Sequence, residues 1–261
     1  MKKDIQEKHN DKIIEQFSKQ AVPFTKIEGH YDSVDTIISM SEVTSNDTVL
    51  DMACGTGIVT LAFAKYADSV VGIDVTQSML DEAIKKQKQE NITNIKFDLG
   101  SVENLPYADN SFDIVFTRYS FHHFLDTKNI FDEMIRVCKV NGRVIVVDAT
   151  PEDKNASYYN YVEKLRDPSH TKALTFDEFN ELFSNKFLSN HKHSSYNVDI
   201  ELESLLEASF PNDGDTDKIR EIFKSDIEIN RLGMNARYEN DKIYCSYPIS
   251  IFLANKFSNL Y

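Results

Sequence analysis

Residues 49–57 read VLDMACGTG, and this stretch decides the fold. A short apolar strand delivers the acidic residue Asp51, a turn of small residues follows, and a helix rich in alanine and leucine begins after Gly57. Gly55 and Gly57 lack a Cβ atom, so a ligand can approach the backbone of the turn closely. Ligands of open parallel sheets bind in the crevice outside the carboxyl ends of the strands. The stretch therefore predicts a ligand site at the end of the first strand.

Strand-like and helix-like segments alternate around this turn up to about residue 150. Further strands are expected at 70–74, 95–99, 112–117 and 143–148, and helices at 58–66, 76–89 and 129–138. Asn141-Gly142 is expected to end the last of these helices. The alternation is typical of βαβ units and a parallel sheet. Apolar runs such as VIVVD suit strands that are buried on both faces.

The flanking regions follow other patterns. Helices are expected at 5–28 and 31–40, and then at 152–182 (with a break at Asp167-Pro168), 201–210 and 217–229. A strand is expected within 187–200. Residues 242–256 are expected to form a closing strand or a hairpin, in which Pro248 takes an edge or bulge position.

Asp74 ends the second strand, at about the distance from the glycine turn expected of a ribose-binding carboxylate. The alternative is a surface aspartate that caps the next helix. In the dinucleotide fingerprint G-x-G-x-x-G, the third glycine is here Thr60, and Asp51 would lie awkwardly beside a pyrophosphate. Asp51 suits a ligand with an amino group and a sulfonium, which favours S-adenosylmethionine over NAD.

Four segments together resemble signatures of class I S-adenosylmethionine-dependent methyltransferases. They are VLDMACGTG (49–57), VVGIDVTQSMLDEA (70–83), LPYADNSFDIVFTRYSFHHF (105–124) and RVCKVNGRVIVVD (136–148). More narrowly, they resemble the methyltransferase type 11 group, related to the ubiquinone and menaquinone biosynthesis methyltransferases. The segment PED…LRDPSH (151–170) is similar to a bacterial subgroup of that group, which extends the resemblance over nearly the full chain.

The resemblance implies an α/β, Rossmann-like fold with a mostly parallel seven-stranded sheet, helices on both faces and an added helical lid. It divides the chain into a helical cap or lid (1–44), an S-adenosylmethionine-binding core (45–150), and a substrate-side helical insertion with the closing strands of the same sheet (151–261). Phe17, Gln20 and Phe24 could close over the cofactor as part of the lid, with ordinary helix packing as the alternative.

The implied cofactor is S-adenosylmethionine, which leaves as S-adenosylhomocysteine. The residues implied to hold it are Asp51, Ala53, Cys54, Gly55 and Gly57 at the methionine part, Asp74 at the ribose, Val75 and Met79 near the adenine, Ser101 and Val102 at the adenine edge, and the backbone of Thr117 near the amino group. The family usually has aspartate where Ser101 stands, so the adenine contact is weaker or Glu103 compensates for it.

Methyl transfer depends on positioning and on the exclusion of water, and it needs a base where the nucleophile must lose a proton. The candidate catalytic residues are Arg118, His122 and His123, which follow the fourth strand. The resemblance favours His122 as the histidine that faces the site, with packing under the next loop as the alternative for either. The candidate substrate residues are Tyr119, Tyr158, Arg166 and His170, for which helix capping or packing is the alternative.

The composition narrows the class of partner. The formal net charge of −13 argues against a nucleic acid, because phosphate binding needs clustered lysine and arginine. No apolar run approaches the roughly 18 residues of a membrane span, and no secretory signal is indicated. Cys54, Cys138 and Cys245 form no CxxC pair, so we expect no metal and a cytoplasmic location.

The expected acceptor is a small molecule, anionic or aromatic. The sequence decides neither the acceptor atom nor the oligomeric state. Two other functions stay open at this point. One is a non-catalytic protein that binds S-adenosylmethionine or S-adenosylhomocysteine, and the other is an NAD-linked oxidoreductase, which Thr60 disfavours.

Overall fold

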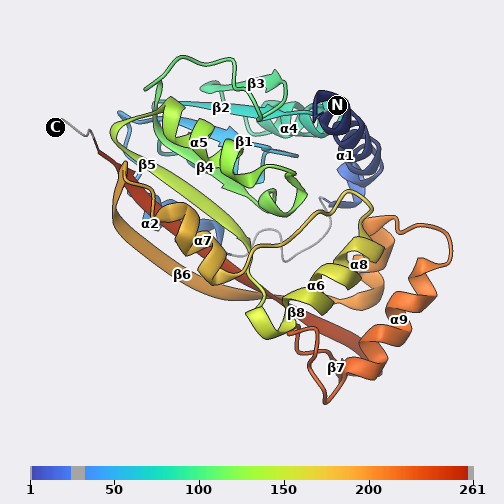
Figure 1. Cartoon of the computed structure of the whole chain (residues 1–261). Helices are drawn as coiled ribbons and strands as arrows, with labels where there is room; N and C mark the ends of the chain where they lie inside the picture. Colours follow the sequence, from blue (N-terminus) through green and yellow to red (C-terminus); the bar gives the residue numbers. More distant parts are fainter. Residues whose placement is uncertain (1, 25–32, 258–261) are drawn as a thin grey trace.

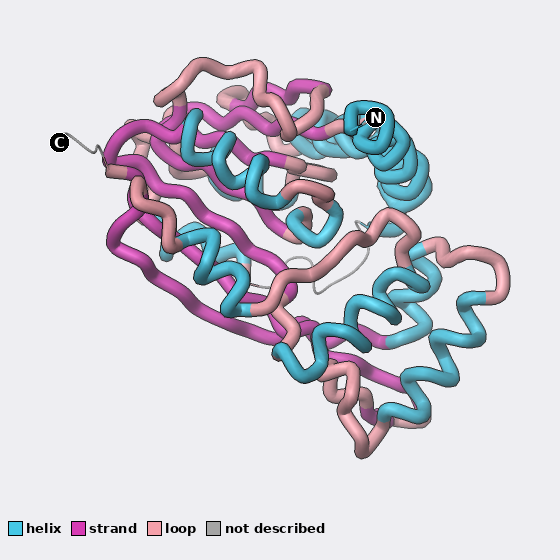
Figure 2. Tube along the Cα trace, viewed as in Figure 1, coloured by secondary structure: helices cyan, strands magenta, loops and turns pink. Residues whose placement is uncertain are grey.

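One twisted sheet runs through the molecule, with helices packed on both of its faces (Figures 1 and 2). The computed structural model describes residues 2–24 and 33–257. The strands are β1 (Thr48–Met52), β2 (Ser69–Asp74), β3 (Ile95–Leu99), β4 (Phe112–Arg118), β5 (Cys138–Ala149), β6 (Leu188–Glu201), β7 (Arg237–Glu239) and β8 (Lys242–Lys256). The helices are α1 (Lys2–Phe24), α2 (Val34–Ser41), α3 (Ile58–Ala64), α4 (Gln77–Gln89), α5 (Thr127–Val137), α6 (Asp153–Arg166), α7 (Phe176–Phe183), α8 (Leu202–Ser209) and α9 (Asp215–Asp226), with a 3₁₀ turn at Phe121–His123.

The strand order is β3-β2-β1-β4-β5-β8-β6, and the short β7 pairs with β8. Strands β1 to β5 are parallel to one another, whereas β8 and β6 run antiparallel to their neighbours. The Rossmann-like fold predicted from the sequence is therefore confirmed. The seven strands of this path match the expected number, and β7 is an addition that forms a hairpin with β8 through Asn240-Asp241. Both turn residues have positive φ, as tight hairpins require.

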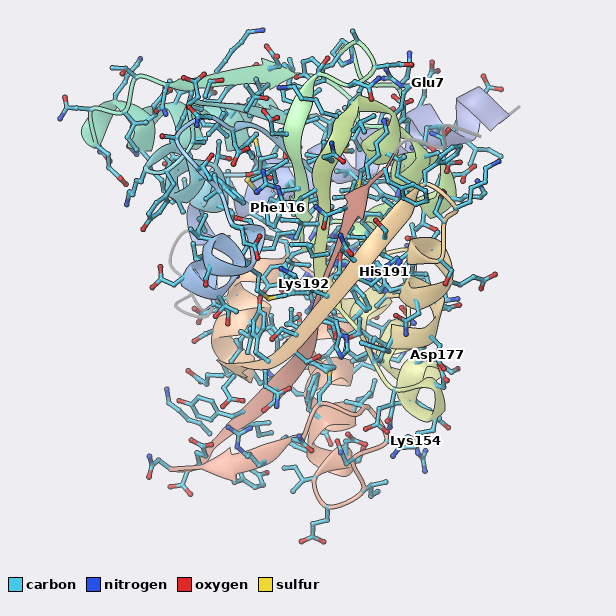
Figure 3. All side chains as sticks on the ribbon, turned by 90° about the vertical axis from the view of Figure 1, so that its left-hand side faces the viewer. Glu7, Phe116, Lys154, Asp177, His191 and Lys192 are labelled. Carbon is cyan, nitrogen blue, oxygen red and sulfur yellow. The ribbon has the colours of Figure 1, made fainter. Side chains whose placement is uncertain are left out.

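Burial on both faces of the sheet explains the continuous apolar runs. On β5, Val144 and Val146 belong to the core that includes residues of α5 and α7. Ile145 and Val147 point the other way, to the core that includes residues of α2, α3, α6 and α8. Phe116 on β4 lies inside the molecule in the same way, while charged side chains such as Lys154 project from its outline (Figure 3).

The expected helix end at Asn141-Gly142 is wrong. Helix α5 ends at Val137 and β5 begins at once with Cys138, so the pair lies within a strand. Asn141 has φ +67°, and the register between β4 and β5 shifts at this level. A Cβ on Gly142 would come within 2.7 Å of the Cys138 sulfur. The Asn-Gly pair thus serves an irregularity in a strand, which requires the same backbone freedom as a helix end.

Pro248 also lies differently from the expectation, because β8 is an interior strand between β5 and β6. The pairing of β5 with β8 stops at Ala149 and Ile249, one residue short of the proline. The carbonyl of Pro248 accepts from the N–H of Thr150 at 2.8 Å, so that side of the residue faces the end of β5. The missing N–H of proline is tolerated because the neighbouring strand has ended there.

Gly57 is required for close packing of the first turn of α3. It has φ +74°, and a Cβ there would lie 3.0 Å from the Cβ of Ala83 on α4. We expect Gly57→Ala to lower the free energy of unfolding by about 2–4 kcal/mol, the sum of left-handed strain and overpacking. Gly214 has φ +84° but open space around it, so Gly214→Ala should cost only about 1–2 kcal/mol. Urea denaturation of both variants measures the difference, and equal losses would show that packing against Ala83 is unimportant.

Candidate functional site

The carboxyl ends of the parallel strands form one edge of the sheet, and this edge carries the first of two cavities. The register brings Met52 level with Ile73 and Thr117, so the ends of β1, β2 and β4 lie side by side. Helix α1 passes this edge and contacts both α4 and α8 (Figure 1). The first cavity lies here and holds about 980 Å³ of space, part of it open to solvent.

Most of the residues predicted to hold the cofactor line this first cavity. They are Asp51, Ala53, Cys54, Gly55, Asp74, Val75, Met79, Ser101 and Val102. Gly57 is not among the lining residues, because it packs against α4. Thr117 is not among them either. It is buried, and its hydroxyl donates to the carbonyl of Met52 at 2.7 Å. Arg118, the next residue of β4, lines the cavity instead.

The carboxylate of Asp74 is fixed by the backbone of the turn that it faces. One oxygen accepts from the N–H of Gly55 and the other from the N–H of Thr76, both at 2.8 Å. Burial raises the pKa of Asp74, and these two donors act against that effect. Each oxygen keeps a second lone pair, so the carboxylate could still accept two hydroxyl donors of a ligand. Asp74 therefore braces the glycine turn in addition to facing the cavity.

Asp51 is buried beside the same turn and is held by Thr60. The Thr60 hydroxyl donates to Asp51 Oδ2 at 2.6 Å. Burial raises the pKa of Asp51 to about 7, and the bond from Thr60 acts against it. A cationic ligand would favour the ionised form. Thr60 stands where the dinucleotide fingerprint has its third glycine. A glycine could not make this hydrogen bond to Asp51, which explains why the position carries a threonine.

Helix α1 also lines the first cavity, through Asn10, Ile13 and Phe17. Phe17 was expected from the sequence to close over the cofactor, whereas Asn10 and Ile13 were not identified by the sequence patterns. The helix is held in place by polar contacts: the Gln16 amide donates to the carbonyl of Ser209, and the His9 ring contacts the carbonyl of His123 at 2.6 Å. Helical spacing showed that α1 has an apolar face, but not which surface that face covers. The side chain of Phe24 lies outside the described residues.

A second cavity of about 730 Å³ adjoins the first. Phe17, Tyr119 and His123 line both, so they mark the junction between the two cavities. The other apolar and aromatic lining residues are Ala149, Tyr159, Val198, Ile200, Leu205, Ala208, Tyr247 and Ile249. The other polar ones are Gln20, His122, Glu163, Arg166, Asp167 and Ser209.

Tyr119 stands at this junction in a backbone conformation that non-glycine residues rarely adopt, with φ +55°. Its hydroxyl accepts from Arg118 Nη2 at 3.1 Å and contacts the hydroxyl of Tyr196 at 3.0 Å. The Arg118 guanidinium also lies 4.1 Å from the centre of the Tyr119 ring. Backbone strain of this kind tends to occur at functional sites, and the three side chains together fix the position of the tyrosine ring.

His122 lines the second cavity and pairs with a buried acid from the next strand. Its Nδ1 lies 2.6 Å from Asp148 Oδ1. Asp148 is 1% exposed and also accepts from the N–H of Phe121 at 2.7 Å. Burial alone would lower the pKa of His122, but the charge of Asp148 and its hydrogen bond raise that pKa above the ordinary value. The pair has the geometry of a histidine base oriented by a carboxylate.

His123 has the opposite electrostatic character. Its side chain is buried, its ring packs edge-on against Phe17 with a centroid distance of 5.0 Å, and its Nδ1 lies 3.1 Å from Ser169 Oγ. Burial, with the neighbouring His122, lowers the pKa of His123 to about 3. His123 is therefore neutral at physiological pH, although its ring centre lies only 4.3 Å from that of His122.

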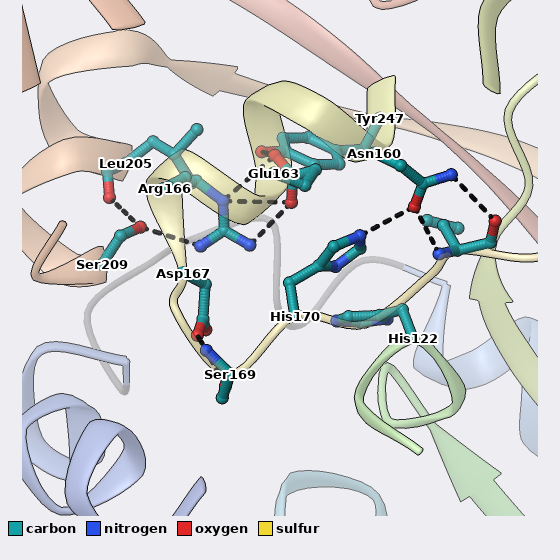
Figure 4. A network of polar contacts seen from close by, with 12 residues as sticks. His122, Asn160, Glu163, Arg166, Asp167, Ser169, His170, Leu205, Ser209 and Tyr247 are labelled. Carbon is teal, nitrogen blue, oxygen red and sulfur yellow. Dashed lines mark hydrogen bonds and ion pairs between the residues drawn. The ribbon is translucent and has the colours of Figure 1, made fainter. Parts of the chain in front are cut away.

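Of the remaining candidate substrate residues, Arg166 lines the second cavity, whereas His170 and Tyr158 line neither cavity. Arg166 lines the second cavity, but its guanidinium pairs with Glu163 at 2.7 Å (Figure 4). His170 is fully buried, bonded to the amide oxygen of Asn160 at 2.8 Å, and not among the lining residues. Tyr158 is half-exposed on the outer side of α6 and lines neither cavity. Tyr159, one residue on, faces the second cavity, because one step along a helix rotates the side chain by about 100°.

Comparisons with known proteins agree with this geometry. A family model described as a methyltransferase domain matches residues 43–224. The chain belongs to this methyltransferase family. The methyltransferase is 32% identical over 195 residues to the uncharacterised methyltransferase YcgJ of Bacillus subtilis, covering 73% of this chain and 77% of YcgJ. The crystal structure of YcgJ matches with a TM-score of 0.81 and 26% identity, covering 88% of this chain and all of that one.

A second relative is the demethylmenaquinone methyltransferase of Lactobacillus johnsonii, 33% identical over 144 residues, which span 49% of this chain and 59% of the relative. The family membership makes this chain an S-adenosylmethionine-dependent methyltransferase. It implies a small-molecule methyl acceptor. Neither a non-catalytic binder nor an NAD-linked oxidoreductase is favoured by these matches. Among the helices that the structure describes, none has the length and apolar character needed to cross a bilayer.

The first cavity fits S-adenosylmethionine. A Cβ on Gly55 would meet no atom within 4 Å, so the turn leaves open space for a ligand. The acids that line the cavity, Asp51, Asp74 and Glu103, outnumber its guanidinium, that of Arg118. An acidic lining suits a cationic sulfonium and would repel a pyrophosphate. The residues of 33–257 and of α1 that the structure describes include no cluster of three metal-ligating side chains.

Proposed function

We propose that this methyltransferase methylates a neutral, largely apolar small molecule that binds in the second cavity. The observation that carries the proposal is the junction at Phe17, Tyr119 and His123, where this mostly apolar cavity meets the cofactor cavity. A nucleophile bound in the second cavity would reach the cofactor cavity through this junction. Such positioning supplies much of the rate enhancement of a displacement reaction.

The charged groups around the second cavity are already paired within the protein, which favours a neutral methyl acceptor. Arg166 pairs with Glu163, whose other oxygen accepts from the Tyr247 hydroxyl at 2.8 Å. Asp167 accepts from both the N–H and the hydroxyl of Ser169. The guanidinium that could have bound an anionic acceptor is therefore already neutralised. An aromatic or aliphatic body suits the lining better than a carboxylate or phosphate does.

His122 is the group that we expect to take a proton from the acceptor. S-adenosylmethionine supplies a methyl group on a sulfonium, and the electron pair of the broken S–C bond stays on sulfur. The acceptor atom forms the new bond to the methyl carbon, and its proton passes to Nε2 of His122. Nδ1 cannot serve, because it is held by Asp148. Asp148 stabilises the imidazolium that results.

We also propose a role for each segment of the chain in binding the cofactor and the methyl acceptor. Residues 1–44 act as a lid, 45–150 hold the cofactor, and 151–261 shape the acceptor cavity. Within the core, Asp74 binds the ribose, Asp51 the charged methionine part, and Ser101 with Glu103 the adenine edge. A cytoplasmic location follows only from the three free cysteines and belongs to the proposal as well.

Incubation of the enzyme with a metabolite extract and methyl-labelled S-adenosylmethionine, followed by mass spectrometry, tests this proposal. We expect a labelled neutral small molecule. Ala208→Phe fills the second cavity and should abolish labelling while S-adenosylhomocysteine still binds. Glu207→Phe places the same ring on the exposed side of α8 and should leave labelling unchanged. Full labelling by Ala208→Phe, or an anionic product, would refute the proposal.

A further inference from the structure

We infer that the neutral ring of His123 binds the methyl-accepting substrate by accepting a hydrogen bond from it. Ser169 and Asp167 are positioning residues that keep the His123 proton on Nδ1, so that Nε2 is free to accept. This inference rests on the proposed function, because it assigns a role inside the acceptor cavity. It gives His122 and His123 different tasks, and it assigns a purpose to the buried loop after α6.

A chain of three polar side chains runs from this loop to the junction of the cavities. Asp167 Oδ1 accepts from the Ser169 hydroxyl at 2.6 Å and from the Ser169 N–H at 2.8 Å (Figure 4). The Ser169 oxygen lies 3.1 Å from His123 Nδ1. All three residues are buried, with Ser169 completely so. Buried polar groups without a stabilising role are costly, so the completeness of this chain points to a function.

The direction of the hydrogen bonds fixes the tautomer of His123. Burial acts to raise the pKa of Asp167, but the charge of Arg166 and the hydrogen bonds from Ser169 act to lower it and keep the group ionised, so the carboxylate can only accept. The one hydroxyl proton of Ser169 must then point to Asp167. The Ser169 oxygen is left as an acceptor, and His123 Nδ1 must donate to it. A neutral ring with its proton on Nδ1 carries a lone pair on Nε2.

Nε2 of His123 is the atom left for a ligand. None of the residues that the structure describes makes a hydrogen bond with it, and His123 lines both cavities. The backbone around it is held from two sides, since the His9 ring contacts the His123 carbonyl and the Thr171 hydroxyl donates to the carbonyl of His122 at 2.8 Å. A rigid, unprotonated nitrogen at the junction would accept a hydrogen bond from an O–H or N–H group of the acceptor.

The two adjacent histidines are thereby complementary. His122, paired with Asp148, binds a proton readily, whereas His123 stays neutral and cannot compete for the proton that is removed. The acceptor class that fits is an apolar or aromatic molecule with a hydroxyl or amino donor close to the methylated atom. A substrate that carries only hydrogen-bond-accepting atoms at that position would place a lone pair against the lone pair of His123 Nε2. Such a substrate would bind more weakly.

The test uses the complex with S-adenosylhomocysteine, phenol as the donor probe and toluene as its matched control without a donor. Nitrogen-15 NMR of labelled histidine reports the tautomer, and His123→Gln identifies the signals by their loss. We expect wild-type His123 to carry its proton on Nδ1, phenol to shift the Nε2 signal, and phenol to bind about three to ten times tighter than toluene, the contribution of one hydrogen bond. None of these readouts needs turnover, so they are independent of the proposed reaction.

Two pairs of variants complete the test. Ser169→Ala should move the proton of His123 to Nε2 and abolish the preference for phenol, while Ser184→Ala, at an exposed serine of the next helical segment, should change neither. His123→Gln retains an acceptor oxygen near the place of Nε2 and should keep part of the preference, whereas His123→Leu should lose it. A wild-type proton on Nε2, or equal binding of phenol and toluene, would overturn the inference.

Discussion

Replacing Asp74 with alanine is expected to weaken binding of S-adenosylmethionine and S-adenosylhomocysteine by about 100- to 10,000-fold. Two lone pairs of the carboxylate are occupied by the N–H groups of Gly55 and Thr76, and two are left for the hydroxyls of a ribose. Hydrogen bonds to a charged group contribute about 1.5–3 kcal/mol each, and every 1.4 kcal/mol is about tenfold in affinity. Isothermal titration calorimetry with S-adenosylhomocysteine measures the change.

Asp81 provides the matched control for this experiment. It lies exposed on α4, where its carboxylate accepts from Gln77 at 2.8 Å. Asp81→Ala should leave the dissociation constant unchanged. The loss of two backbone contacts should lower the stability of Asp74→Ala by about 1–3 kcal/mol, so circular dichroism must show that the variant is folded at the assay temperature. An affinity within threefold of wild type would remove Asp74 from the cofactor site.

Replacing His122 with alanine is expected to lower kcat by about 100- to 10,000-fold, the range typical of a general base, with the acceptor found in the extract screen. Affinity for S-adenosylhomocysteine should stay within about twofold, because His122 lines the second cavity and not the first. His191, exposed on the edge strand β6 (Figure 3), is the control, and His191→Ala should have wild-type kcat. Unchanged turnover in His122→Ala would exclude it as the base.

The pH profile gives the same assignment a second test. A base must be neutral to accept a proton, so kcat/KM should fall as the pH falls through the pKa of His122, which Asp148 raises above its ordinary value of about 6.5. Asp148→Asn removes the negative charge, and the pKa of His122 should then fall. The acid limb of the profile should move to lower pH, even though the maximal rate declines. A limb that does not move would show that another group titrates.

Most residues proposed to hold the cofactor could be expected to lie together, because their signals are local in sequence. Asp51, Gly55 and Asp74 stand within one βαβ unit, where the strand ends and the turn between them fix their relative positions. Thr60 could be seen as a departure from the dinucleotide pattern, but its bond to Asp51 could not. Arg118 and not Thr117 lines the cavity, which depends on how β4 ends and not on the motif, and the contact of the Thr117 backbone with the cofactor stays a prediction.

The lining of the second cavity could not be assembled from the sequence, because its residues come from segments far apart in the chain. Whether Arg166 is available to an anion depends on Glu163, which is one turn away, and on Tyr247 in β8. Whether Tyr158 or Tyr159 faces inward depends on which side of α6 meets the sheet. Residues of α1 enter both cavities through contacts across the molecule that no periodicity reveals.

By itself, the sequence determined the alternation of strands and helices, the glycine turn and its two acids, because backbone freedom, apolar periodicity and the spacing of a single βαβ unit act over short stretches of chain. Only the tertiary structure decided that His123 meets Ser169 and Asp167, that His122 meets Asp148, and that α1 covers both cavities. These contacts arise from packing between distant elements. The hydrogen-bond direction and burial that separate the roles of the two adjacent histidines exist only once that packing is complete.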